Sequence, residues 1–200
     1  MPSNWNTRYT LLDRLKNDDD QEAWEDFKAY YDPFILIMLS KFNIAHDDKD
    51  DLVQEILLSL WKSLKQFKPD ENRAKFRTWF SQIIYCRSMD FYRKKSSSDK
   101  KVESLTKDPT ALESFTEPEI EKIFQKEWEA HIVNVALENI SPMFSGKAID
   151  VFKMAMKNTE TNTIAKSFDL KTNTVIQLKN RVKNRLVKEI QTLKSERELF

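Results

Sequence analysis

Apolar positions in the first half of the chain recur with helical spacing. Large apolar side chains return every three or four positions over 24–42, which predicts an amphipathic helix that Pro33 kinks or divides. A second apolar stripe, with the order i, i+1, i+4, i+5, i+8, predicts a helix over 46–64. A polar loop at 68–75 then leads into a third helix expected over 76–95.

The chemical character of the chain changes after residue 95. Residues 96–118 are polar, carry two prolines and have little apolar periodicity, which is typical of a linker. Helical patterning returns at 119 and continues to the end of the chain. We therefore expect an all-α protein, with one small helical domain at 1–95, a flexible linker at 96–118, and a second small helical domain at 119–200.

The second domain ends in a pattern typical of DNA-binding proteins. After helices expected over 119–140 and 146–157, a short helix at 161–168, a tight turn and a longer basic helix at 173–193 follow one another. That succession is the helix-turn-helix arrangement.

Composition excludes several classes of protein. The chain has one glycine, Gly146, which argues against folds rich in β-hairpins and against glycine-rich phosphate-binding loops. One cysteine and two histidines cannot make a four-ligand zinc site or a disulfide framework, so we expect no metal and no cofactor. The longest apolar run, 34–39, is too short to cross a bilayer, and we expect a cytoplasmic protein with no membrane partner.

Charge is segregated along the chain although its formal sum is only +1. Residues 73–101 hold nine basic and two acidic side chains, and residues 171–189 hold six basic and one acidic. One such patch is compatible with an ordinary solvated helix face, whereas two patches on distinctive helices favour contact with phosphates.

The last helix offers a base-reading face opposite an apolar stripe. Amide and arginine side chains can read base edges in a major groove, and lysines can bind phosphates. The alternative is a basic amphipathic helix that docks on another protein. The candidate DNA contacts are Lys171, Thr172, Asn173, Thr174, Ile176, Gln177, Asn180, Arg181, Lys183 and Asn184.

The helix over 46–64 has an apolar residue, Leu58, in the middle of its polar face. An apolar side chain among charges indicates a place where a partner docks. The acids at the start of this helix also fit two other roles: caps that favour the helix dipole, or a metal-binding carboxylate set, Asp47, Asp48, Asp51 and Glu55, as in all-α nucleotide hydrolases.

The helix over 76–95 interleaves aromatic and basic side chains. This combination suits single-stranded nucleic acid, in which bases stack on rings and cations hold the backbone. Burial on both faces of the helix is the alternative, and it is favoured for Tyr85 and Met89. The candidate contacts here and in the preceding loop are Arg73, Lys75, Arg77, Thr78, Trp79, Gln82, Tyr85, Arg93, Lys94 and Lys95.

Together these segments resemble a known family. DDLVQEILLSLWKSL and FRTWFSQIIYCRSMDFYRKK resemble conserved region 2 of extracytoplasmic-function (ECF) sigma factors of the sigma-70 family, and TIAKSFDLKTNTVIQLKNRVKNRL resembles their region 4 helix-turn-helix. The chain departs from the family at Gln82 and Cys86, where Arg and Asn are usual, and at Asp169, where a glycine is common. The stretch 176–178 also replaces a more basic segment of the family.

The resemblance implies a sigma factor that recruits RNA polymerase core to promoters and has no catalytic activity. It implies that the helix over 46–64 docks on the β′ clamp helices of the polymerase. It also implies that the helix over 76–95, with its preceding loop, opens the minus-ten element, and that the last helix enters the minus-thirty-five major groove. The β flap and an anti-sigma factor are further implied partners. The polymerase-binding residues would be Asp51, Gln54, Glu55, Leu58 and Lys62.

The residues alone are also compatible with two other functions. An autonomous helix-turn-helix repressor would bind an operator tightly without polymerase, and a metal-dependent nucleotide hydrolase would use the carboxylate set. The near-neutral net charge favours the sigma factor, because a protein with two basic faces offset by acidic surfaces should bind free DNA poorly.

Overall fold

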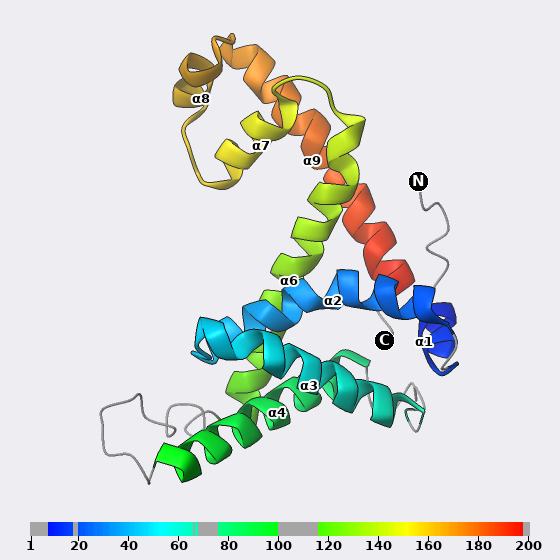
Figure 1. Cartoon of the computed structure of the whole chain (residues 1–200). Coiled ribbons are helices and arrows are strands. Elements are labelled where there is room, and N and C mark those ends of the chain that lie inside the picture. The colour runs from blue at the N-terminus through cyan, green and yellow to red at the C-terminus, as the bar shows by residue number, and fades with distance from the viewer. Residues whose placement is uncertain (1–7, 18–19, 66, 68–75, 100–115, 198–200) are drawn as a thin grey trace. The chain divides into compact units, whose positions relative to one another are not determined.

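The computed structural model describes residues 8–17, 20–65, 67, 76–99 and 116–197, and every regular element among them is helical (Figure 1). This confirms the all-α prediction. None of these helices combines the length and apolarity that a membrane span requires. The elements are α1 (Arg8–Leu15), α2 (Gln21–Lys41), α3 (His46–Leu64), α4 (Phe76–Asp99), α6 (Glu117–Ile140), the short 3₁₀ helix η1 (Ser141–Met143), α7 (Ala148–Met156), α8 (Thr161–Phe168) and α9 (Thr172–Arg197).

The chain divides into two compact units, 1–129 with 198–200, and 130–197. The division falls within α6, later than the residue 119 at which the sequence places the second domain. The expected loop at 68–75 and residues 100–115 of the expected linker lie outside the described residues. Residues 96–99 continue α4 instead of beginning the linker.

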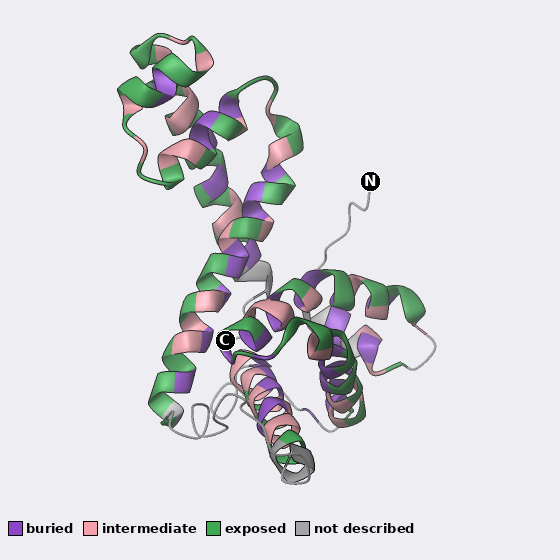
Figure 2. Cartoon of the chain, turned by 60° about the vertical axis from the view of Figure 1, so that its left-hand side comes forward, coloured by how far each residue is buried: buried purple, intermediate pink, exposed green. Residues whose placement is uncertain are grey.

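Aromatic side chains fill the core of the first unit. The ring of Tyr31 on α2 lies 4.2 Å from that of Phe27 and 4.9 Å from that of Phe80 on α4, measured between centroids. The ring of Phe76 lies 5.7 Å from that of Tyr31. In Figure 2 buried residues are purple and alternate with exposed green ones along the helices. Helix α2 packs against neighbours on two sides, and its apolar stripe is wide for this reason.

Helix α2 runs undivided through Pro33. Proline removes one backbone donor and usually breaks a helix interior. Here Phe34 and Ile35, the next two residues, are almost completely buried, and tertiary packing of this kind compensates for the missing hydrogen bond.

The short helix α1 has no counterpart in the sequence prediction. An ion pair joins it to α2: the Arg14 guanidinium donates to both carboxylate oxygens of Asp20, at 2.7 and 2.9 Å. Asp20 also caps α2 by accepting from the backbone N–H of Ala23 at 3.0 Å. The hydrogen bonds from Arg14 and then from Ala23 lower the pKa of Asp20 below its usual value.

The first turns of α6 belong to the aromatic core of the first unit. Trp128 is 2% exposed and stacks on Tyr31 with a centroid distance of 5.9 Å, and its ring meets that of Phe34 edge to face at 5.0 Å. Phe124 contacts Phe34 and Phe42, and Lys41 pairs with Glu127 at 3.1 Å. These contacts are the physical reason why the first unit extends beyond residue 119.

Part of a capping box begins α6. The backbone N–H and the hydroxyl of Thr116 both donate to the Glu119 carboxylate at 2.8 Å. The bond from the backbone N–H is one of the two bonds of the Thr-x-x-Glu motif; the Glu119 N–H bonds to the Thr116 carbonyl instead of its hydroxyl. The same hydrogen bonds lower the pKa of Glu119.

The second unit has a small aliphatic core. Val151 of α7, Ile164 and Ala165 of α8, and Val175 of α9 are buried together. Val182 and Leu186 extend this buried stripe of α9, as its apolar periodicity predicts.

Helices end at Asn and Asp in a chain with one glycine. Asn43, Asn158 and Asp169 all have φ between 50° and 58°, the left-handed conformation that glycine usually supplies. After α8, the N–H of Leu170 bonds to the carbonyl of Ala165 and that of Asp169 to the carbonyl of Lys166, which is the Schellman pattern. The helix-turn-helix turn thus keeps its geometry with Asp at the position where glycine is common.

Candidate functional surfaces

The polar face of α3 gathers the five residues predicted to bind a partner. Asp51, Gln54, Glu55, Leu58 and Lys62 are all exposed, and Leu58 keeps 49% of its surface in contact with solvent. The remaining apolar side chains of α3 over 52–64 are buried or half-buried. Leu58 is therefore an apolar side chain that the core does not use.

A surface hollow of about 540 Å³ lies along this face. Leu58 lies in its wall between charges of both signs, with Arg87 of α4 joining the residues of α3. Arg87 donates to Asp90 at 3.3 Å. The hollow can therefore accept an apolar side chain from a partner together with charged side chains of either sign. Its lining residues are Glu55, Leu58, Ser59, Lys62, Ser63 and Arg87.

The acids at the start of α3 do not form a carboxylate cluster. Among the residues that the structure describes, no three or more His, Cys, Asp or Glu side chains gather in the geometry of a metal site. Asp48 instead binds Lys95 at 2.7 Å, and Glu55 lies 3.8 Å from the ammonium of Lys94. Two of the four carboxylates considered for a hydrolase thus pair with cations of α4.

The beginning of α4 is fixed by aromatic packing. Trp79 stacks on Phe67 with a centroid distance of 4.5 Å, and it also contacts Phe76. Arg77, Thr78 and Trp79 are half-buried. Arg73 and Lys75, the other basic residues predicted for this region, lie outside the described residues.

The middle of α4 carries exposed, half-buried and buried side chains. Gln82 and Cys86 are exposed, Tyr85 is half-buried with its ring 6.3 Å from that of Phe42, and Met89 is buried. Burial, the alternative favoured for Met89, is what the structure has, and it holds only in part for Tyr85. The stretch therefore exposes fewer aromatic rings than the sequence pattern offered.

Tyr92 anchors the end of α4. Its hydroxyl donates to the backbone carbonyl of Phe42 at 2.5 Å, close to the end of α2. Burial raises the pKa of the phenol above its usual value. The basic residues that follow are therefore held beside the start of α3.

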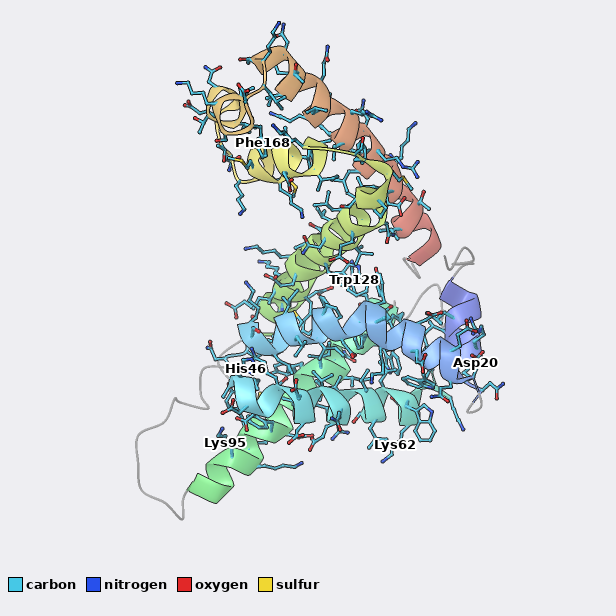
Figure 3. All side chains as sticks on the ribbon, turned by 45° about the horizontal axis from the view of Figure 1, so that its top comes forward. Asp20, His46, Lys62, Lys95, Trp128 and Phe168 are labelled. Carbon is cyan, nitrogen blue, oxygen red and sulfur yellow. The ribbon has the colours of Figure 1, made fainter. Side chains whose placement is uncertain are left out.

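All three basic residues at the end of α4 lie near carboxylates. Arg93 is 3.9 Å from Asp90 on its own helix, and Lys94 and Lys95 reach across to α3. Figure 3 shows Lys95 beside the end of α3 marked by His46, with Lys62 at the opposite end of that helix.

The outer face of α9 is open. The predicted contacts from Lys171 to Asn184 are exposed, except for Thr174, which is half-buried. Ile176 keeps 44% of its surface exposed. Thr172 donates to Asn162 of α8 at 3.4 Å, a contact within the helix-turn-helix. This side of the helix thus presents amides, cations and one isoleucine.

Phe144 lies under one of these side chains. The guanidinium carbon of Arg181 is 5.4 Å from the centroid of the Phe144 ring, a cation–π distance. No local pattern predicts this contact, because 37 positions separate the residues. The same holds for Asp48 and Lys95, which are 47 positions apart.

Comparison with known proteins identifies part of the first unit. Residues 28–98 match the family model described as sigma-70 region 2. The match spans most of α2, all of α3 and nearly all of α4, the helices that carry the hollow and the ion pairs. No curated protein matches the chain.

Seven chains of known structure match this one. One of them is described as the structure of CnrH in complex with the cytosolic domain of CnrY. It is 18% identical, with 92% of this chain and 96% of that chain covered and a TM-score of 0.36.

Proposed function

We propose that the chain is an RNA polymerase sigma factor of the ECF type, because residues 28–98 match the family model described as sigma-70 region 2. It recruits core polymerase to specific promoters and initiates transcription there, in the cytoplasm of a bacterium, with no catalysis of its own. The family match carries this proposal. The roles of individual residues are proposed in addition to the family match.

Polymerase docking is assigned to the exposed face of α3. Leu58 offers an apolar contact, and Glu55 and Lys62 flank it with opposite charges around the hollow. An apolar centre ringed by polar groups is the common form of an interaction hot spot. The proposed occupant is the β′ clamp helices of the polymerase. The second unit would contact the β flap.

Promoter contact is assigned to two helices. Helix α4, with Trp79 and Tyr85 beside cations, would capture the minus-ten strand, and Arg73 and Lys75 in the preceding loop would take part. The exposed face of α9 would enter the minus-thirty-five groove, where Asn180 and Arg181 are of the residue types that read adenine and guanine. Regulation by an anti-sigma factor completes the set of partners.

A matched pair of substitutions tests the docking face. Leu58→Asp should abolish the complex with bacterial core polymerase in size-exclusion chromatography, because a buried unpaired carboxylate is costly at an interface. Met156→Asp is the control, since Met156 is 48% exposed and lies in the second unit. If wild type forms no complex, or if both variants lose it equally, the proposed docking face is wrong.

The two alternative functions make opposite predictions. An autonomous repressor would bind a duplex operator tightly without polymerase, in gel-shift experiments with genomic fragments. A nucleotide hydrolase would need divalent metal and would lose turnover on Asp51→Ala. Either result would replace the proposal.

A further inference from the structure

The basic end of α4 is joined to the acidic start of α3. The ammonium of Lys95 lies 2.7 Å from a carboxylate oxygen of Asp48, and that of Lys94 lies 3.8 Å from a carboxylate oxygen of Glu55 (Figure 3). The proposed function assigns these two lysines to nucleic-acid phosphates. In the free chain both cations therefore already have an anion as neighbour.

The contact between Asp48 and Lys95 is the stronger of the two. It has hydrogen-bond length, and its side chains are only 33% and 45% exposed. The ammonium of Lys95 also lies 5.3 Å from the centroid of the Phe91 ring. The pair between Glu55 and Lys94 is longer and more exposed, at 53% and 72%, and is of the weak surface type.

The local fold holds Asp48 and Lys95 in register. The hydroxyl of Tyr92, three residues before Lys95, donates to the carbonyl of Phe42 at the end of α2. Only a short turn separates Phe42 from α3, which carries Asp48 in its first turn. The two backbone segments that carry the pair are thus held close together.

We propose that Asp48 is an internal substitute for a phosphate: it occupies Lys95 in the free chain until the phosphate of a single-stranded nucleic acid displaces it. Glu55 does the same, more weakly, for Lys94. A lysine ammonium is a compact point charge that binds a carboxylate or a phosphate in the same manner, so the two anions compete. This inference rests on the proposed function. It adds that the free chain inhibits its own binding to single-stranded nucleic acid.

Glu55 connects the two proposed binding events. It lines the hollow on α3 and also pairs with Lys94. A cation on the polymerase that takes up Glu55 leaves Lys94 available for DNA. Docking and strand capture therefore strengthen each other, as any linked pair of binding equilibria must.

Asp48→Asn, compared with Asp50→Asn, isolates the effect. Both substitutions remove one negative charge from the start of the same helix and keep the side-chain shape. Asp50 is exposed and has no ion pair with any residue that the structure describes. Both variants therefore gain the same general electrostatic attraction for nucleic acid, and only Asp48→Asn releases Lys95 from its ion pair.

The measurement is fluorescence anisotropy of a labelled single-stranded oligonucleotide with the full chain, without polymerase, across a salt series. Displacement of Asp48 breaks one partly exposed ion pair, which lowers affinity by up to about fivefold. We expect Asp48→Asn to bind up to about fivefold more tightly than Asp50→Asn, with a similar salt slope, because Lys95 contacts a phosphate in both complexes. The double variant Asp48→Asn/Lys95→Ala should lose this gain.

The outcomes separate this inference from the function on which it rests. Equal affinity of the two single variants, with binding that still falls on Arg93→Ala, overturns the role of Asp48 and leaves strand binding intact. Binding that is absent or independent of salt in every variant overturns the assignment of Lys95 to strand phosphates, whereas the function itself is overturned only if the chain adds no start sites to transcription by core polymerase. Circular dichroism melting of each variant verifies that the helices are intact.

Discussion

The basic helices of the two units differ in how many of their cations lie against carboxylates. In the first unit, the cations at the end of α4 lie against carboxylates of α3 and α4. In the second unit, the exposed face of α9 has one ion pair with a described residue, between Arg185 and Glu189 at 3.9 Å. A basic helix can thus be present in sequence and yet have most of its charge already occupied. Only the structure distinguishes these two conditions.

The cores of the two units differ as well. The first is built from stacked aromatic rings and includes Trp128 from α6, whereas the second is a small aliphatic cluster around Val151 and Val175. The larger and more interlocked core should give the first unit the greater sensitivity to loss of a single side chain.

Removal of Trp128 is expected to have the largest effect. Trp128→Ala should lower the free energy of unfolding of the first unit by about 3–5 kcal/mol, because it leaves a large cavity beside Tyr31 and Phe34. Urea unfolding monitored by fluorescence and circular dichroism measures this change. Trp61→Ala is the matched control, since Trp61 is half-buried, and it should cost clearly less. Equal losses would show that α6 contributes little to this core.

Loss of a cation from α9 comes next in size. Lys183→Ala should weaken binding to duplex DNA about eightfold at 0.1 M salt and lower the salt slope by about 0.9, the value for one phosphate contact on a duplex. Lys95→Ala should change binding to a single strand by less than that, because Asp48 occupies the lysine in the free chain. Fluorescence titrations across a salt series measure both. A larger loss from Lys95→Ala than from Lys183→Ala would reverse the comparison of the two helices.

Acid should remove the ion pair between Arg14 and Asp20. The pKa of Asp20 is lower in the folded chain than in the unfolded chain, so its stabilising contribution is present above about pH 4 and is lost as the pH falls through the lowered value. Asp20→Asn should therefore be less stable than wild type at pH 7, and the difference should shrink in acid. Urea unfolding at pH 7 and at about pH 3 tests this. A difference that is independent of pH would exclude the ion pair with Arg14 as its source.

The smallest change is expected at the helix-turn-helix turn. Asp169→Gly should stabilise the second unit by up to about 1 kcal/mol, because glycine adopts the left-handed conformation without the strain of a side chain. Thermal unfolding measures the gain. Ser167→Gly, two positions earlier inside α8, should have the opposite sign. A destabilising Asp169→Gly would indicate that the aspartate side chain itself stabilises the turn.

Local patterns predicted most of the helices. The apolar spacing of α3 and of α8 with α9, and the short polar breaks between helices, are properties of neighbouring residues, and the structure reproduces them within a few positions. Helix α1 was missed because it is short and is held by contacts with other elements, through buried Leu12 and Leu15 and the ion pair of Arg14 with Asp20. The packing of Trp128 in the first unit was not foreseen, because it joins residues almost a hundred positions apart.

The candidate surfaces were predictable only as far as a single helix can show them. Leu58 stood out because an apolar residue interrupts a polar face, a signal that lies within one helix. Arg87 in the same hollow, Asp48 beside Lys95, and Phe144 beneath Arg181 all come from different elements. Contacts of this kind depend on how helices pack, and no local pattern encodes them.

Transcription by core polymerase tests the proposed function most directly. Purified bacterial core polymerase is incubated with fragments of the genome that encodes the chain, with and without the chain, and the transcript 5′ ends are mapped. We predict a small set of start sites that appear only with the chain, share a minus-ten and a minus-thirty-five element, and disappear with Leu58→Asp. Start sites identical to those of core polymerase alone would contradict the proposal that this chain is a sigma factor.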